Sequence, residues 1–173
     1  MHLDRLKVPG VDFSTGSLGH GEALSLGCAL GARLQGKTYH TYCVLSDGEC
    51  DEGSTWEAAM AAAHYKVTNL TWFVDCNGFS LDGPVDQVMT LSPLDKKFES
   101  FGWRVLTIDG HDFDAILDAI ATARAETTKP TVILAKTVKG KGVSFMENKT
   151  GWHYGGLDDQ NKAKALADIR AMQ

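Results

Sequence analysis

The chain alternates between short apolar runs and longer stretches in which apolar residues recur at helical spacing. The apolar runs are rich in β-branched and aromatic residues, which favours β-strands. We predict four strands, at residues 39–45, 70–74, 103–108 and 131–135. The second and fourth are apolar nearly throughout, which is typical of strands buried on both faces of a parallel sheet.

Helical stretches lie between and after these runs. We predict helices at residues 17–34, 54–65, 93–101, 112–126 and 158–172, and loops at residues 1–15, 84–91 and 139–156. This order of elements indicates the α/β class, with a parallel sheet flanked by helices on both faces. No repeat, low-complexity segment or domain boundary interrupts the chain, so we expect residues 1–173 to form a single domain.

The helical periodicity also predicts which side chains are buried. The apolar positions of the first helix are Leu24, Cys28, Leu30 and Leu34. The inner face of the helix at 112–126 would consist of Phe113, Ile116, Leu117 and Ile120. The helix at 54–65 is expected to begin with a capping box, in which Ser54 is the N-cap and Glu57 completes the motif.

Composition and charge narrow the possible functions. The 173 residues carry a formal net charge of −5 and no long run of Lys and Arg, which argues against binding to nucleic acid or to a membrane surface. No apolar stretch approaches the roughly 20 residues of a membrane span, and the N-terminus has no signal-peptide core. The four cysteines show no CxxC or Cys/His pairing, so we expect reduced thiols and a cytoplasmic protein.

Polar, glycine-containing turns follow the first two predicted strands. Asp47-Gly48 comes after the first strand, and Asn77-Gly78 comes after the second, thirty residues further on. Ligands bind such sheets outside the carboxyl ends of the strands, so the Asp47 and Asn77 side chains would face one cleft if the strands are neighbours. Carboxylate, carboxamide and carbonyl oxygens suit Mg²⁺ bridged to a phosphate. Either residue alone is also a common turn residue.

The spacing of these turns resembles the motif of enzymes that use thiamine diphosphate. Four separated segments, in the family's order, also resemble transketolases: 15–21 (TGSLGHG), 52–58 (EGSTWEA), 77–83 (NGFSLDG) and 136–153, which begins KTVKGKGVSFME and ends WH. The resemblance covers nearly the whole chain from Pro9 to Gly156. It identifies the chain as a member of the transketolase family, similar to the N-terminal, diphosphate-binding subunit of a split transketolase.

The resemblance implies roles around the diphosphate. Asp47, the Asn77 side chain and the Phe79 carbonyl would hold Mg²⁺. The Gly48 backbone would meet the diphosphate of thiamine diphosphate. Glu49 adjoins Gly48 and counts among the cofactor-binding residues, although we expect its carboxylate to point outward, away from the diphosphate.

The resemblance implies further roles around the cofactor rings and the substrate. His153 would lie near the diphosphate and substrate, His20 could donate to either, and Glu52 would join a carboxylate network between subunits. His20 is also explained as a polar residue at the start of a helix. The segment against the aminopyrimidine and thiazolium rings would be Gly16, Ser17 and Leu18.

The sequence departs from the family pattern in several places. Ser46 and Cys76 replace the Gly and Asn that usually precede the motif's Asp and Asn, and neither is an expected metal ligand. Trp152-His153 is followed by Tyr154-Gly155-Gly156, where the family has a small residue and later a proline. The family's segment before Pro9 and its second half have no counterpart here, and that second half carries the glutamate that protonates the aminopyrimidine.

The resemblance therefore implies an enzyme that works only with a partner. The partner would be a C-terminal subunit with the pyrimidine domain, in a hetero-oligomer such as a heterotetramer. The expected reaction transfers a two-carbon ketol unit from a ketose phosphate or related ketose to an aldose acceptor.

Other functions stay open from the sequence. A different thiamine diphosphate reaction, such as a decarboxylating acyl transfer or acyloin synthesis, is compatible because this half barely encodes the substrate. A non-catalytic scaffold subunit is also compatible. A nicotinamide site is disfavoured, because Gly16-x-x-Gly19-x-Gly21 lacks a preceding strand and the GxGxxG spacing.

Overall fold

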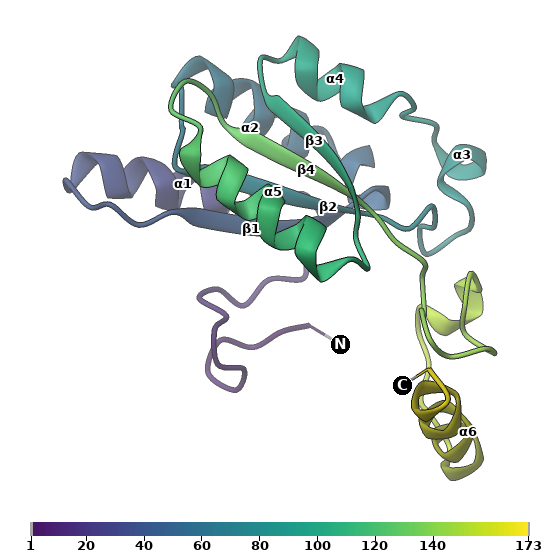
Figure 1. The fold of residues 1–173 in the computed structure, drawn as a ribbon. Helices are drawn as coiled ribbons and strands as arrows, with labels where there is room; N and C mark the ends of the chain where they lie inside the picture. Colours follow the sequence, from purple (N-terminus) through teal and green to yellow (C-terminus); the bar gives the residue numbers. More distant parts are fainter. Residues whose placement is uncertain (1, 173) are drawn as a thin grey trace.

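The computed structural model describes residues 2–172 and contains a parallel sheet of four strands (Figure 1). The strands are β1 (Thr41–Ser46), β2 (Leu70–Cys76), β3 (Arg104–Asp109) and β4 (Thr131–Lys136). They lie in the order β1-β2-β4-β3, and every neighbouring pair is parallel. The four predicted strands are confirmed, with ends that differ by one or two residues.

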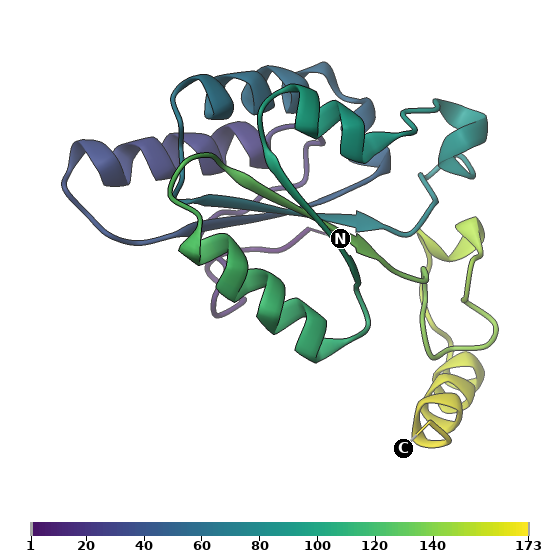
Figure 2. The same cartoon turned by 45° about the horizontal axis from the view of Figure 1, so that its top comes forward.

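The helices cover the two faces of the sheet unequally (Figures 1 and 2). One face carries α1 (Gly21–Leu34), α2 (Gly53–His64) and α4 (Leu94–Ser100), and the other carries α5 (Phe113–Ala125). The remaining helical elements are the short α3 (Val85–Val88), the 3₁₀ turns η1 (Gly48–Asp51) and η2 (Thr150–Trp152), and α6 (Asp159–Arg170). Helices on both faces confirm the predicted fold class, whereas α3 corrects the loop predicted at 84–91.

The handedness of the connections explains this distribution. The links from β1 to β2 through α2, and from β2 to β3 through α4, advance across the sheet in one direction. The link from β3 to β4 through α5 returns in the opposite direction. Because crossovers between parallel strands are right-handed, advancing and returning connections lie on opposite faces. All four carboxyl ends meet at one edge, which is where the candidate residues follow β1 and β2.

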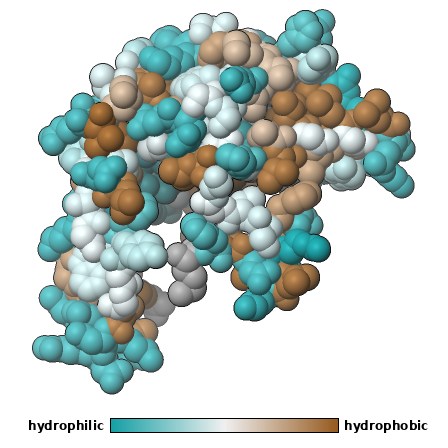
Figure 3. Space-filling view, turned by 180° about the vertical axis from the view of Figure 1, so that it is seen from behind, coloured by the Kyte–Doolittle hydropathy of each residue, from teal (hydrophilic) through white to brown (hydrophobic). Residues whose placement is uncertain are grey.

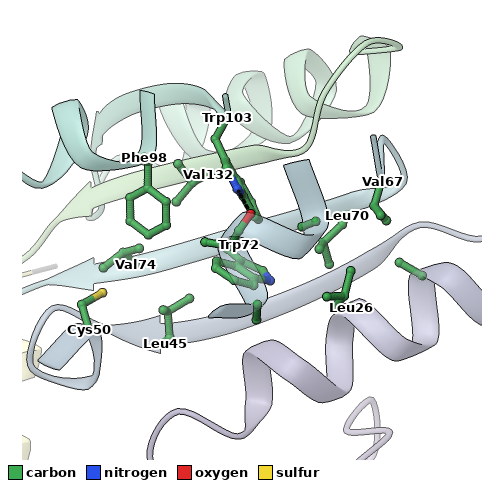
Figure 4. Close-up of a cluster of buried hydrophobic side chains, with 14 of the residues drawn as sticks. Leu26, Leu45, Cys50, Val67, Leu70, Trp72, Val74, Phe98, Trp103 and Val132 are labelled. Atoms are coloured by element: carbon green, nitrogen blue, oxygen red, sulfur yellow. Dashed lines mark hydrogen bonds between the residues drawn. The ribbon is translucent and has the colours of Figure 1, made fainter. Parts of the chain in front are cut away.

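The main core lies between the sheet and α1, α2 and α4. Its centre is an aromatic group, Trp72 of β2, Phe98 of α4 and Trp103, in which the two indole ring centroids are 4.4 Å apart (Figure 4). The Trp72 indole N–H donates to Ser25 Oγ at 3.0 Å, and that of Trp103 donates to the Ala59 carbonyl at 2.9 Å. Each buried side chain of this size contributes about 1.5–3 kcal/mol, so these residues fix α1, α2 and α4 on the sheet.

Helix α5 is buried differently from the prediction. Ala119 and Ala123 are buried against Ile133 of β4, whereas Phe113 is 80% exposed and Leu117 is 62% exposed. Ile116 and Ile120 are half-buried. The prediction of Phe113 and Leu117 as inner residues is therefore wrong, because the small alanines let the helix approach the sheet along a neighbouring stripe.

Helix α1 also exposes two residues that were predicted to be buried. Leu26 and Ala29 enter the core, while Leu24 lies largely on the surface and Leu34 is 89% exposed. Hydrophobic residues are visible at the surface in the view from behind (Figure 3). Leu30 packs against the core as a half-buried residue.

The predicted capping box of α2 is not formed. The helix begins at Gly53, its N-cap residue is Glu52, and no side chain makes the capping hydrogen bond. Ser54 lies inside the first turn, so its hydroxyl is not at the N-cap position. Within residues 2–172, no helix combines the length and the apolar character needed to cross a membrane.

Candidate active site

The loops after β1 and β2 contact each other at the carboxyl edge of the sheet. Ser46 and Asp75 are paired in register, and the Asp47 N–H donates to the Asp75 carbonyl at 3.1 Å. The Asp47 carboxylate in turn accepts the Gly78 N–H at 2.7 Å. The structure therefore brings Asp47 together with the turn that contains Asn77, as the neighbouring strands required.

A short network organises the turn after β2. The Asn77 amide donates from Nδ2 to Asp75 at 2.9 Å, and its Oδ1 accepts the Phe79 N–H at 3.0 Å. The Asp75 carboxylate also accepts a hydrogen bond from the Thr137 hydroxyl, directly after β4. Asp75 and Thr137 were not among the predicted residues, although a polar side chain at the carboxyl end of a buried strand was a signal for both.

The two aspartates concentrate negative charge at this edge. Burial raises the pKa of the Asp47 carboxyl, and the Asp75 charge beside it adds to the effect. Within residues 2–172, neither carboxylate takes part in a salt bridge. A half-buried carboxylate beside a second one is stabilised in its charged form by a cation, so the charge distribution favours a cation here.

The residues present fit a magnesium ion bound to a diphosphate. No group of three or more His, Cys, Asp and Glu side chains suited to a metal occurs within residues 2–172, so a metal would need mixed oxygen ligands. The Asp47 carboxylate, the Asn77 amide oxygen and the Phe79 carbonyl are ligands of that type. A Cβ atom on Gly48 would lie 3.1 Å from the Ser80 Cβ, so glycine allows this backbone to approach Ser80 closely.

A second loop joins the first through Glu49. One Glu49 carboxylate oxygen accepts the Gly19 N–H at 2.9 Å, and the other accepts the Ser46 N–H at 3.4 Å. Gly19 has φ of +74°, and a Cβ atom there would lie 2.7 Å from the Glu52 Cβ. The expectation that Glu49 points outward is wrong, because its carboxylate bridges two backbone segments. The neighbouring acid Asp51 is exposed.

The segment before Gly19 lies at the surface beside this bridge. Gly16, Ser17 and Leu18 are exposed, and His20 contacts the Leu18 carbonyl through Nδ1 at 3.0 Å. These residues are accessible to a cofactor, and the roles given to them and to the exposed Glu52 remain predictions.

His153 lies in the segment after β4. It follows η2 and is exposed, and its Nδ1 lies 3.1 Å from Lys139 Nζ. Partial burial and the Lys139 charge lower the pKa of the His153 imidazole. Within residues 2–172, no hydrogen bond joins His153 to Asp47 or Asn77, so its role near the diphosphate remains a prediction.

A buried acid beneath the loops was not predicted. Glu22, in the first turn of α1, is fully buried, and its Oε1 accepts the Thr55 hydroxyl at 2.8 Å. Its Oε2 has no hydrogen-bond partner among the described residues. Burial raises the pKa of Glu22, with a smaller contribution from the charge of Glu49. The sequence signal that could have predicted the burial of Glu22 was its position as an isolated acid in an otherwise apolar helical stretch.

A pocket of about 400 Å³ opens beside Asp47. It is bounded by Asp47, Cys76 and Lys136, and by apolar side chains of the loop between α3 and α4. A larger hollow of about 530 Å³ lies at the opposite edge of the sheet, among Arg33, Lys37 and Lys66 at the ends of α1 and α2. Only the pocket of about 400 Å³ adjoins the candidate residues, so the volume of a pocket does not identify the site.

Comparison with known proteins agrees with this geometry. The family model described as "Transketolase, thiamine diphosphate binding domain" matches residues 2–169. The chain is 43% identical over 164 residues to a putative uncharacterized transketolase family protein, y4mO, of Sinorhizobium fredii, and the match covers 94% of this chain and 59% of that protein. It is 39% identical to the 6-deoxy-6-sulfo-D-fructose transketolase subunit SqwG of a Clostridium species, with 97% and 61% of the two chains covered.

Two further comparisons concern another curated relative and a solved structure. The chain is 38% identical to one subunit of the apulose-4-phosphate transketolase of Phocaeicola vulgatus, covering 95% of this chain and 58% of that one. It superposes on the Campylobacter jejuni transketolase crystal structure with a TM-score of 0.87 at 32% identity, over 93% of this chain and 26% of that one. The chain thus spans about three fifths of the curated relatives. It belongs to the transketolase family, to the thiamine diphosphate-binding domain of these enzymes.

Proposed function

We propose that residues 1–173 form one domain that holds the magnesium-diphosphate end of thiamine diphosphate. Together with a partner chain that carries the pyrimidine domain, it would transfer a two-carbon ketol unit from a ketose to an aldose acceptor. The observation that supports this proposal is the contact between the loops after β1 and β2, in which the Asp47 carboxylate accepts the Gly78 N–H at 2.7 Å, beside the turn where the Asn77 amide oxygen accepts the Phe79 N–H at 3.0 Å.

The chain's own residues would bind and orient rather than transfer protons. Asp47, Asn77 and the Phe79 carbonyl would hold Mg²⁺, and the Gly48 backbone would meet the diphosphate. The Glu49 bridge would keep the loop at Gly16–Gly19 in place beside them. Thiamine diphosphate supplies the carbanion chemistry of ketol transfer when it is bound. The acid that acts on its aminopyrimidine would come from the partner chain.

Two observations support a partner chain. The relatives from Clostridium and Phocaeicola are named as transketolase subunits. In addition, α1 and α2 expose apolar side chains that contact with another chain would cover: Leu24, Leu34, Met60 and Tyr65.

The relatives' names favour ketol transfer over other thiamine diphosphate reactions, because two of them are named as transketolase subunits and the third as a transketolase family protein. The names do not agree on a substrate. One refers to 6-deoxy-6-sulfo-D-fructose and another to apulose 4-phosphate, at nearly equal identity to this chain. We therefore propose the reaction class, with a ketose as donor, and leave the sugar to experiment.

The test is calorimetric titration of thiamine diphosphate and Mg²⁺ into the chain, alone and with a candidate pyrimidine-domain partner. Binding that requires the partner and Mg²⁺, followed by ketol transfer, is the expected result. Asp47→Ala should abolish the Mg²⁺-dependent binding. Asp51→Ala is the matched control, because it removes an exposed carboxylate from the same loop. Equal binding by the two variants would refute the metal assignment, and binding without turnover of any ketose would favour the scaffold alternative.

A further inference from the structure

The hollow at the amino edge of the sheet is built from three separate loops. These loops lead from α1 into β1, from α2 into β2 and from α5 into β4, and they lie together at the left of the sheet in Figure 1. The hollow has a volume of about 530 Å³, which is within the range of pockets that hold small molecules. It lies at the edge opposite Asp47 and Asn77, so a ligand here would be distinct from the cofactor.

Hydrogen bonds between the loops and helices fix the walls of this hollow. Arg33 donates from Nη1 to the carbonyls of Tyr65 and Lys66, at 2.6 and 3.2 Å, and so ties the end of α1 to the end of α2. The Asn69 amide donates from Nδ2 to the Ala29 carbonyl at 3.0 Å. A ligand would therefore meet a largely preformed site, which lowers the entropic cost of binding.

The lining of the hollow is cationic. Arg33, Lys37 and Lys66 contribute to it, and among the described residues that line it none is Asp or Glu. Within residues 2–172, none of the three cations forms a salt bridge. Glu126, at the start of the loop from α5 to β4, is already paired with Arg104 at 3.0 Å. The excess of positive charge favours an anion.

Cations at this edge also have a simpler explanation, because the carboxyl ends of helices carry partial negative charge. Each end corresponds to about half an elementary charge, so the ends of α1, α2 and α5 together offset about one and a half of the three positive charges. Arg33 fulfils this role directly, through its bonds to the last carbonyls of α2. The helix ends therefore account for Arg33 and leave much of the charge of Lys37 and Lys66 uncompensated.

The backbone at Lys66 indicates that its side chain is needed. Lys66 has φ of +50°, in the left-handed region just after α2, where helices commonly end with glycine. Lysine is disfavoured in this conformation relative to glycine or asparagine. The position is therefore better explained by a role of the ammonium group than by the ending of the helix.

Neutral polar groups complete the lining. Thr38, Thr68 and Thr127 add hydroxyl groups, which can donate hydrogen bonds to phosphate oxygens. Asn69 also lines the hollow, and its Oδ1 is buried without a hydrogen-bond partner among the described residues. A hydroxyl group of a ligand that reached this oxygen would satisfy it. Cations and hydroxyl donors together suit a phosphate group.

We propose that this hollow is a second ligand site, which binds a small phosphate-bearing anion. Lys37 and Lys66 would contact the phosphate, and the threonine hydroxyls would complete its hydrogen bonds. Arg33 would mainly hold the two helix ends together. The inference rests on the amino edge of the sheet alone, so it depends neither on the proposed cofactor site nor on a partner chain.

The test is an NMR titration of the ¹⁵N-labelled chain with inorganic phosphate, at constant ionic strength and without Mg²⁺. Constant ionic strength separates binding from general screening, and the omission of Mg²⁺ keeps the proposed metal site unloaded. We expect saturable shifts of the Thr38, Thr68 and Thr127 amides, with a dissociation constant of about 1 mM or below. The Gly48 and Gly78 amides, at the other edge, should not shift.

A parallel titration with glycerol 3-phosphate identifies the source of the phosphate group. Tighter binding of glycerol 3-phosphate than of inorganic phosphate would assign the site to a phosphate ester, and the reverse order would assign it to free phosphate. Glycerol alone should produce no saturable shift, because it lacks the charge that the lysines recognise.

Two lysine substitutions test the geometry. Lys66→Asn removes the charge and suits φ of +50°, so this variant should be at least as stable as the parent chain. We expect it to weaken phosphate binding at least about threefold, the effect of one exposed ion pair. The matched control is Lys129→Asn, which removes an exposed lysine from the loop before β4 that does not line the hollow. Its dissociation constant should stay within about twofold of the parent value, because solvent and salt screen a charge outside the site.

Three results would overturn the proposal. These are shifts that do not saturate, shifts at Gly48 and Gly78 in place of the amides of the hollow, and equal weakening by the two lysine variants. Binding of thiamine diphosphate and Mg²⁺ is measured separately by calorimetry, so a failure at one edge of the sheet is distinguishable from a failure at the other.

Discussion

Glu22 is fully buried near the start of α1, and replacing it with glutamine should stabilise the chain at and above neutral pH. Its carboxyl receives one hydrogen bond, from Thr55, and its second oxygen has none. Burial raises the pKa of Glu22, so the folded chain holds this proton more tightly than the unfolded chain. The stability associated with the proton is complete below the unfolded pKa and is lost as pH rises through the folded pKa.

The structure sets the size of this effect. Glutamine keeps the oxygen that accepts from Thr55 and remains neutral, so it resembles the protonated acid. A buried polar group without a partner costs about 1–3 kcal/mol, and a charged group costs more, so we expect Glu22→Gln to gain about 1–3 kcal/mol at pH 8. Near pH 4, just below the ordinary pKa of glutamate, the acid is mostly protonated in both states, and the two proteins should be nearly equally stable.

Urea unfolding between pH 4 and pH 8 measures this difference directly. The matched control is Glu57→Gln, the same chemical change on the exposed side of α2. The control should follow the parent protein across the range, while the Glu22→Gln curve should separate from it with rising pH. If the free energies of unfolding of Glu22→Gln and the parent protein changed in parallel with pH, the charge of Glu22 would not destabilise the folded chain, and the reasoning would be refuted.

Three further predictions concern the loops. Gly19→Ala should lower the free energy of unfolding, measured in urea, by about 1–3 kcal/mol, because alanine is disfavoured at φ of +74° and its Cβ would crowd Glu52. Unchanged stability would show that the loop moves freely. Glu49→Ala should speed hydrogen exchange at the Gly19 amide by removing its acceptor, and an unchanged rate would contradict the bridge. Lys139→Met should raise the pKa of His153 in an NMR titration, because burial and the lysine charge lower it; an unchanged pKa would mean that the two side chains are apart in solution.

The fold and the meeting of the two loops could be predicted because both follow from short-range pattern. Apolar runs such as Leu70–Val74 identify the strands, and the order of elements allows few topologies. Once β1 and β2 are neighbours, Asp47 and Asn77 must approach each other, since each follows its strand directly.

The errors occur where distant residues decide the outcome. The burial of Phe113 and Leu117 depends on where α5 meets the sheet, and periodicity cannot separate two adjacent stripes of one helix. The position of Glu49 depends on Gly19, thirty residues away, whose N–H is brought to the Glu49 carboxylate by the tertiary fold. Local propensity carries no information about such a partner.

The open features of the chain converge on β1. Asp47 directly follows this strand, and within residues 2–172 no strand pairs with the outer edge of β1. A strand held by hydrogen bonds on one side only is freer to fray, and fraying at Ser46 would displace the Asp47 loop from the turn at Gly78.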